Sequence, residues 1–288
     1  MANSRQCRRR CTIALCGAFV IGLLLGGCGR RSDSQGLVWQ LTHLDEYHPP
    51  ESASRDTARY FPTLYVRAER DSLMGIVNPN PLEPFRDVAE APGRDLITQL
   101  RFSRQVLQER AGDSVRVPFD ANLVLDRKMN FGQVMEAVYI TNYGTFRVPH
   151  LITASGHEHV VEPPRIHREF GPVGWSAWVW WMPDQSVKWM AWPDSSQRMV
   201  MRTLPSRDGA ADIPALLDSL HQALDGKEYI PPGSDRLIGV WAYDGLTYPE
   251  LMRFMDEIRY PKKGIQLAAR ITLLQGENWS PPELPPVE

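Results

Sequence analysis

The stretch LIGVWAYDGLTYPELMRFMDEIRYPKKGIQLAARIT, residues 237–272, changes the spacing of its apolar residues twice. The period is about two, then about 3.6, then about two again, which predicts a strand, a helix and a second strand. Thr247 is a suitable cap for the helix, and Pro249 and Glu250 suit its first turn. The stretch therefore predicts a unit of α+β structure.

One face of the predicted helix suits burial. Its apolar residues fall at helical spacing and are Leu251, Met252, Met255 and Ile258. Pro261 and Gly264 follow, and both residue types disfavour further helix. We therefore expect the helix to end before residues 265–271 extend again as a strand.

This pattern resembles the C-terminal part of the periplasmic domain of the biopolymer-transport proteins ExbD and TolR. The positions that carry the resemblance are Ala242, Asp244, Tyr248, Met255, Asp256, Ile258, Gly264 and a closing strand that ends at Thr272. The matching positions include no catalytic group. The resemblance therefore implies a fold family and no particular reaction.

A weaker version of the same order of elements occurs earlier in the chain. Residues 64–77 alternate as a hairpin around a polar turn, Asp95 begins a helical pattern, 114–119 suits a strand, 130–140 a helix and 145–153 a strand. In the second half, a hairpin starts near Trp178 and Asp212 is a suitable helix cap. Both halves thus predict hairpin, helix, strand, helix, strand.

Equivalent positions in the two halves keep nearly constant separations. Ser72 and Ser186 are 114 residues apart, Asp95 and Asp212 as well as Phe131 and Tyr248 are 117 apart, and Gly144 and Gly264 are 120 apart. A repeat of this size predicts two copies of one domain rather than a solenoid, whose periods run from about 20 to 50 residues.

Each copy is expected to be a small sheet with two helices packed on one face, which gives the fold class α+β. The pattern leaves open whether the two sheets stay separate or join edge to edge. ExbD and TolR domains associate as dimers, so the resemblance implies a homodimer or a pseudo-dimer formed within one chain.

The N-terminus has the layout of a secretory signal, with arginines before an apolar segment at residues 12–27. About fifteen apolar residues are short for a membrane span, which needs about twenty. The segment ends in Leu25-Gly26-Gly27-Cys28, which resembles the bacterial lipobox, so Cys28 is the expected site of lipid attachment. Gly29 after the cysteine favours the outer membrane.

We accordingly divide the chain into a lipoprotein signal peptide (1–27), a tether and N-terminal loop (28–59), a first ExbD/TolR-like repeat (60–154), a linker (155–171), a second repeat (172–274) and a proline-rich tail (275–288). The apolar segment at 12–27 contains no carboxylate. ExbD and TolR use an aspartate in their membrane helix for proton coupling, so this role has no residue here.

Charge and cysteine content exclude further classes of protein. The formal net charge is −2 and the isoelectric point is about 6.4, whereas a nucleic-acid binder would show a basic domain or stripe. All four cysteines lie within the first 28 residues, so the folded part is expected to have no disulfide. We found no nucleophile motif, phosphate-binding loop or paired-carboxylate motif, and expect a protein that is not an enzyme.

Two clusters of residues are candidates for binding. The first comprises His150, His157, Glu158, His159, Glu162 and His167, to which the residues at 43–48 add further histidines and acids. These side chains can bind zinc or copper, but they lack the spacing of known zinc motifs. We expect solvated histidines, no bound metal and no cofactor.

The second cluster is a hairpin that contains Trp175, Trp178, Trp180, Trp181, Trp189 and Trp192. Strand alternation places Trp178 and Trp180 on one face and Trp181 on the other, so a sheet covered on one side would expose some of them. Trp178, Trp180, Trp181 and Trp189 therefore form a candidate binding surface, although a packed core between the repeats explains the same residues.

Together these features predict a non-enzymatic, lipid-anchored protein of the bacterial cell envelope that faces the periplasm. We expect it to be a binding or scaffolding component of a biopolymer-transport or envelope-integrity system. Its expected partners are the membrane, through the anchor, and peptidoglycan or envelope proteins of the TonB or ExbD type. Two alternatives stay open: a glycan-binding lipoprotein that uses the tryptophan hairpin, and a metal-handling lipoprotein that uses the histidines.

Overall fold

The structure is a computed structural model that describes residues 47–59, 61–70, 72–79, 89–112, 117–162, 175–191, 200–224, 237–261, 267–268 and 270–274. All of them belong to one unit, Ser34–Glu288. The predicted signal segment, Cys28 and the proline-rich tail lie outside the described residues. Within the described ranges, no helix is long and apolar enough to cross a membrane.

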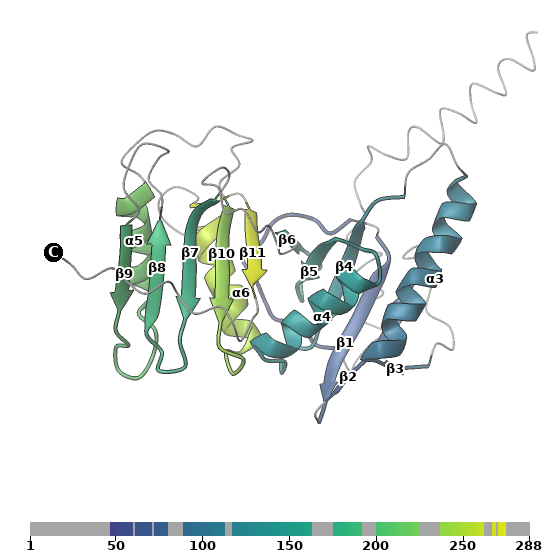
Figure 1. Cartoon of the computed structure of the whole chain (residues 1–288), viewed down its shortest axis with the longest axis horizontal. Helices are drawn as coiled ribbons and strands as arrows, with labels where there is room; N and C mark the ends of the chain where they lie inside the picture. Colours follow the sequence, from purple (N-terminus) through teal and green to yellow (C-terminus); the bar gives the residue numbers. More distant parts are fainter. Residues whose placement is uncertain are drawn as a thin grey trace, which may run out of the picture. The chain divides into compact units, whose positions relative to one another are not determined.

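The chain forms a mixed α/β fold with four described helices and an 11-stranded sheet (Figure 1). The strands are β1 (Thr63–Glu69), β2 (Ser72–Asn78), β3 (Ala91–Pro92), β4 (Asp120–Leu125), β5 (Val148–Ile152), β6 (Glu158–Glu162), β7 (Trp175–Trp181), β8 (Val187–Ala191), β9 (Val200–Leu204), β10 (Leu237–Ala242) and β11 (Arg270–Leu274). The helices are α3 (Gly93–Ala111), α4 (Phe131–Tyr143), α5 (Ile213–Leu224) and α6 (Tyr248–Arg259).

The strand order is the same on both sides of β6. It runs β3-β2-β1-β4-β5 in the first half and, from the far edge inward, β9-β8-β7-β10-β11 in the second. The directions also agree: the hairpins β1–β2 and β7–β8 are antiparallel, whereas β4 and β10 each lie between parallel neighbours. Each half therefore has the same topology, with a central parallel part and a hairpin at its outer end.

Strand β6 joins the two halves into one sheet. It pairs antiparallel with β5 through three residue pairs and parallel with β11 through two, Ile271 with Val161 and Thr272 with Glu162. The Thr272 hydroxyl also donates a hydrogen bond to the Glu162 carbonyl, at 2.8 Å. The edge-to-edge arrangement that the sequence left open is thus present. Because β6 lies within residues 155–171, part of the expected linker is a strand of the sheet.

The largest core cluster contains buried residues from all four helices and from alternate positions along the strands. In α6, the predicted stripe of Leu251, Met252, Met255 and Ile258 is fully buried. The opposite faces of the strands carry two smaller clusters, one around Tyr65 and one around Trp180. The apolar alternation seen in the sequence thus produces strands that are buried on both faces.

The local predictions differ in accuracy. Thr247 caps α6 and Asp212 accepts a hydrogen bond from the Ala215 amide at the start of α5, as predicted. Helix α3 instead begins at Gly93 after Pro92, so Asp95 lies in its first turn rather than at its cap. Of the strand expected at 114–119, residues 114–116 lie outside the described residues, and 117–119 are irregular and precede β4, which begins at Asp120. The short strands β3 and β9 had no sequence prediction.

Candidate functional site: the seam between the halves

The two halves meet where helices α4 and α6 begin. Asn130 and Thr247 cap these helices, and each forms a capping box with the residue three positions later. The two caps form an antiparallel bridge, in which the Phe131 amide donates to the Leu246 carbonyl at 2.7 Å and the Tyr248 amide donates to the Met129 carbonyl at 3.0 Å. Equivalent loops of the two halves therefore hold each other, and we call this region the seam.

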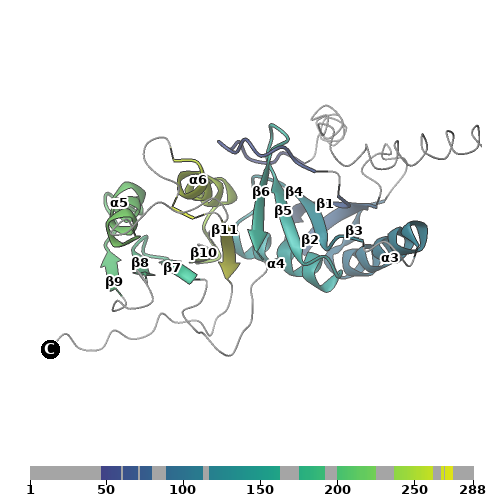
Figure 2. The ribbon, with the colours of Figure 1, turned by 90° about the horizontal axis from the view of Figure 1, so that it is seen from above.

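Residues 47–59, which we call the strap, have no helix or strand of their own but are fastened along the seam. The strap accepts hydrogen bonds from the amides of Arg127 (to the His48 carbonyl, 2.8 Å) and Ala154 (to the Pro50 carbonyl, 3.0 Å). In Figure 2 the strap, drawn in purple, runs from the strands of the first half toward α6. The absence of helix and strand from residues 47–59 agrees with the predicted loop, and the rest of the predicted tether and loop, 28–46, lies outside the described residues. The bonds along the seam show that this loop is packed against the folded body.

Asp256 on α6 receives the strongest set of bonds from the strap. The Ser52 hydroxyl donates to its Oδ1 at 2.5 Å, the Ala53 amide to its Oδ2 at 2.8 Å, and His159 Nε2 lies 2.8 Å from Oδ1. Burial by itself would raise the pKa of Asp256, but the bonds from His159, Ser52 and Ala53 outweigh it and hold the pKa below its usual value. The carboxylate is thus the anchor that joins the strap, β6 and α6.

Ser52, His159 and Asp256 have the residue types of a catalytic triad but not its arrangement. In a triad, the serine and the carboxylate bind opposite nitrogens of the imidazole. Here Ser52 Oγ and Asp256 Oδ1 both lie 2.8 Å from the same nitrogen, His159 Nε2. His159 is fully buried, and the serine proton is directed at the carboxylate. This geometry favours a structural role over activation of a nucleophile. We call the bonded group of Ser52, Ala53, His159 and Asp256 the clasp.

Arg59, at the end of the strap, contacts a second buried polar group. His150 is 2% exposed, and its Nε2 lies 2.9 Å from Asp120. Its Nδ1 lies 3.1 Å from Glu158, but this second contact is not aligned as a hydrogen bond. The Arg59 amide donates to the same Glu158 carboxylate at 3.1 Å. Burial by itself would lower the pKa of His150, but the two carboxylates outweigh it and raise the pKa. The expectation of solvated histidines is therefore wrong for His150 and His159, because both supply buried polar bonds.

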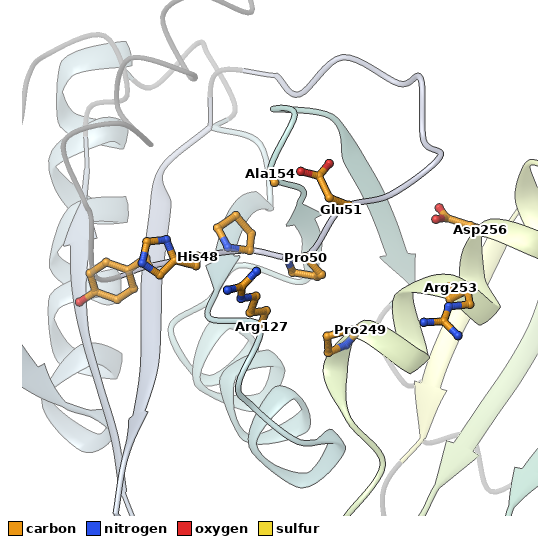
Figure 3. Close-up of a pocket in the computed structure, with 10 residues that line it drawn as sticks. His48, Pro50, Glu51, Arg127, Ala154, Pro249, Arg253 and Asp256 are labelled. Carbon is orange, nitrogen blue, oxygen red and sulfur yellow. The ribbon is translucent and has the colours of Figure 1, made fainter. Parts of the chain in front are cut away.

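A cavity of about 630 Å³ opens where the strap passes α6, and we call it the seam cavity (Figure 3). Its lining residues are Tyr47, His48, Pro49, Pro50, Glu51, Arg127, Ala154, Pro249, Arg253 and Asp256. On α6, Pro249, Arg253 and Asp256 recur at intervals of four and three residues, so they share one helix face. The strap forms the facing wall. The volume of the seam cavity lies within the usual range of small-molecule sites, about 300 to 1,000 Å³.

A second cavity, of about 660 Å³, lies between α5 and α6. Trp181, Leu217 and Phe254 contribute apolar surface to it, and Asp218 and Glu257 contribute carboxylates. Arg253 lines both cavities. The two spaces differ in character, because only the seam cavity combines residues from both halves of the sheet.

The tryptophans of the candidate binding surface are buried. Trp178, Trp180, Trp181 and Trp189 are 5%, 1%, 4% and 1% exposed. Alternation does separate them as expected, with Trp178 and Trp180 in one cluster and Trp181 and Trp189 in the main core. Both faces of this hairpin are covered, whereas the sequence argument assumed one covered face. Glycan stacking on these four rings would therefore require them to move.

Other predicted candidates are only partly placed. Cys28, His43 and His167 lie outside the described residues, as does Trp192. Within the described ranges, no three His, Cys, Asp or Glu side chains are arranged to hold a metal ion. Sequence analysis missed Ser52 and the two arginines of the seam cavity, Arg127 and Arg253. Their one sequence signal is indirect, since Asp256 belongs to the motif that resembles ExbD and TolR.

Comparison of the chain with protein-family models and with curated proteins gives no match.

Proposed function

We propose that the protein is a non-enzymatic, lipid-anchored component of the bacterial cell envelope that binds or scaffolds other envelope components. Its body would be two copies of an ExbD/TolR-like domain, each a sheet with two helices on one face, paired within one chain. The observation that carries this proposal is the repeated strand order with its matched helix caps at the seam. Such a seam provides within one chain the pairing that separate ExbD or TolR domains achieve as dimers.

The polar chemistry of the seam supports binding rather than catalysis. Asp256 and His159 are engaged in bonds that fasten the strap. His150 is enclosed between two carboxylates. Each group therefore has a structural task, and the Ser52 hydroxyl beside Asp256 and His159 lacks the arrangement of a catalytic triad. Anchoring through Cys28 would place the strap between the membrane and the folded body, where its bonds would transmit the attachment to both halves.

Lipid attachment is tested by labelling cells that express the protein with a radioactive fatty acid. The proposal predicts a labelled protein in the membrane fraction, and loss of both label and membrane association in Cys28→Ala. Cys16→Ala is the matched control, since this cysteine lies inside the predicted signal peptide. Label that persists in Cys28→Ala would overturn the assignment of the anchor.

The binding role is tested by sedimenting the purified protein with insoluble peptidoglycan and by cross-linking it in intact envelopes. The proposal predicts co-sedimentation, or a cross-link to a membrane-spanning ExbD-type subunit or a TonB-type protein. Failure of both would overturn the proposed function and leave the question of the anchor unaffected.

A further inference from the structure

The strongest unexplained feature of the molecule is the charge in the seam cavity. Arg127, Arg253 and Glu51 all line it, all are exposed, and none has an ion-pair or hydrogen-bond partner for its side chain among the described residues. By contrast, the nearby Asp256 carboxylate is occupied by three donors. Two cationic groups and one anionic group are therefore free to bind a ligand.

These groups sit on well-held backbone. Arg127 follows β4, and its amide is bonded to the strap at His48. Arg253 lies in the middle of α6, a helix fixed by a capping box at its start and by a buried apolar stripe. Glu51 lies between Pro50, whose carbonyl accepts the Ala154 amide, and Ser52, which is bonded to Asp256. The charges thus come from three separate elements, and little of their backbone needs to be ordered on binding.

The lining of the cavity combines charged side chains with a group of prolines that offers few backbone donors. Pro49, Pro50 and Pro249 contribute three positions that have no backbone N–H, and Tyr47 adds an aromatic ring. A phosphate site normally offers several backbone N–H groups at a loop or helix start. The carboxylates of Glu51 and Asp256 would also repel a doubly charged phosphate. The lining therefore suits a ligand that has a single negative charge, a positive charge and aliphatic groups.

We propose that the seam cavity binds a dipeptide or a free amino acid, that is, a ligand with both a carboxylate and an ammonium group. The guanidinium group of Arg127 would bind the carboxylate, since its planar donors match the geometry of that group, and Arg253 would add a positive charge on the α6 wall. Glu51 would bind the ammonium group, and the proline wall would contact the aliphatic side chains. This inference rests on the cavity alone and requires neither the lipid anchor nor the proposed transport role.

The test is isothermal titration of the full chain in detergent with four probes: alanyl-alanine, its C-terminal amide, its N-acetyl derivative and free alanine. We expect alanyl-alanine to bind, and the amide and the N-acetyl form each to bind about tenfold more weakly or worse, because each lacks one charge-assisted contact. Binding of alanine equal to that of the dipeptide would identify a free amino acid as the ligand. Tighter binding of alanyl-alanine than of alanine would identify a dipeptide as the ligand.

Substitutions test which charged residue binds the carboxylate of the ligand and which binds its ammonium group. Arg127→Gln should weaken alanyl-alanine about tenfold and leave the C-terminal amide unaffected. Glu51→Gln should weaken alanyl-alanine and leave the N-acetyl form unaffected. Lys128→Gln is the matched control for charge, because Lys128 is exposed beside Arg127 but does not line the cavity. Asp218→Asn controls for the second cavity, which this residue lines.

All of these substitutions fall on side chains without partners in the described structure, so the variants should unfold at the same urea concentration as the parent chain. No binding of any probe would overturn the inference. Binding that is insensitive to Arg127→Gln and Glu51→Gln, or equally reduced by Lys128→Gln, would also overturn it.

Discussion

The outer faces of the two halves, opposite their helices, are built differently on the same strand register. In the first half, Tyr65 pairs with Val124, and both lie in a cluster covered by Tyr47 and Ala58 of the strap. At the matching positions of the second half, Trp180 pairs with Trp241, and Trp178 and Met190 complete the cluster. Among the described residues, the cluster of the first half thus includes a separate chain segment, the strap, whereas the cluster of the second half is built from larger side chains of its own hairpin and strands.

The buried polar groups of the two halves also differ. Asn122 of β4 pairs with His150 of β5, where the Asp120–His150–Glu158 group lies. At the corresponding point, Gly239 of β10 pairs with Thr272 of β11, which makes one neutral hydrogen bond to the Glu162 carbonyl. A buried charged group costs desolvation free energy unless it is well paired. At this position of the sheet, the first half thus has a buried group with charged partners where the second half has a neutral hydrogen bond.

Removing Trp180 should have the largest effect. The Trp180 side chain is 1% exposed, so Trp180→Ala leaves a large void in the core. The substitution is expected to lower the free energy of unfolding by about 4 kcal/mol. Tyr65→Ala, at the matching position, should cost a similar amount but should also loosen the strap, because Tyr47 packs on Tyr65 with ring centroids 5.8 Å apart. Urea unfolding measures the first effect, and limited proteolysis within residues 47–59 the second. Proteolysis of the strap in Trp180→Ala would show that the two faces are not independent.

Removing the strap's main acceptor should have the next largest effect. Asp256→Ala removes the carboxylate to which Ser52, Ala53 and His159 are bonded, and is expected to cost about 3 kcal/mol, because these largely buried groups lose their partner. Ser52→Ala keeps the acceptor but removes the bond to Asp256 and the bond that the Ser52 hydroxyl accepts from the Ser54 amide, and should cost about 1–2 kcal/mol. Glu257→Ala, the next residue on α6, is the control and should stay within about 0.5 kcal/mol. Equal effects of Asp256→Ala and Glu257→Ala would show that the clasp does not hold the strap.

The sequence predicts the elements that have a period and a cap. Alternation gives the hairpins, and helical spacing with Thr247 gives α6 with its buried stripe. These features are local, so a short window of residues contains the information that determines them.

The strap and β6 could not be predicted in this way. The strap is irregular and has no apolar period, and its partner Asp256 lies more than 200 residues away along the chain, as the Ser52 bond spans 204 positions. Strand β6 has five residues in a stretch dominated by histidine and acid, which resembles an exposed linker. The seam cavity depends on both segments. Its residues are therefore brought together by tertiary packing that no local pattern encodes.

The pH dependence of stability should separate the two polar groups, with a smaller effect than the substitutions above. Asp256 has a lowered pKa, so its contribution is present above the usual carboxylate range and is lost as the pH falls through its folded pKa. His150 has a raised pKa, so its contribution is present below its usual value and is lost as the pH rises through its folded pKa. We therefore expect the clasp to weaken in acid and the His150 group to weaken above neutral pH.

Urea unfolding between about pH 6 and about pH 9 tests the alkaline arm. The parent chain should lose stability with rising pH, and His150→Gln should remove that dependence while lowering stability throughout. His157→Gln is the control, since this partly exposed histidine has no buried ion pair among the described residues. A pH dependence that survives in His150→Gln would assign the titration to another group.

The smallest effect comes from exchanging the matched residues that begin the two helices. Phe131 and Tyr248 are both fully buried, but the Tyr248 hydroxyl has no hydrogen-bond partner among the described residues, and burial raises its pKa. Tyr248→Phe should therefore stabilise the chain by about 1 kcal/mol, because an unsatisfied buried hydroxyl is removed. The reciprocal Phe131→Tyr should destabilise it by at least as much, since it adds a hydroxyl at an apolar site. Urea unfolding measures both, and a loss of stability in Tyr248→Phe would mean that this hydroxyl is satisfied and that the two helix starts are less alike than their packing indicates.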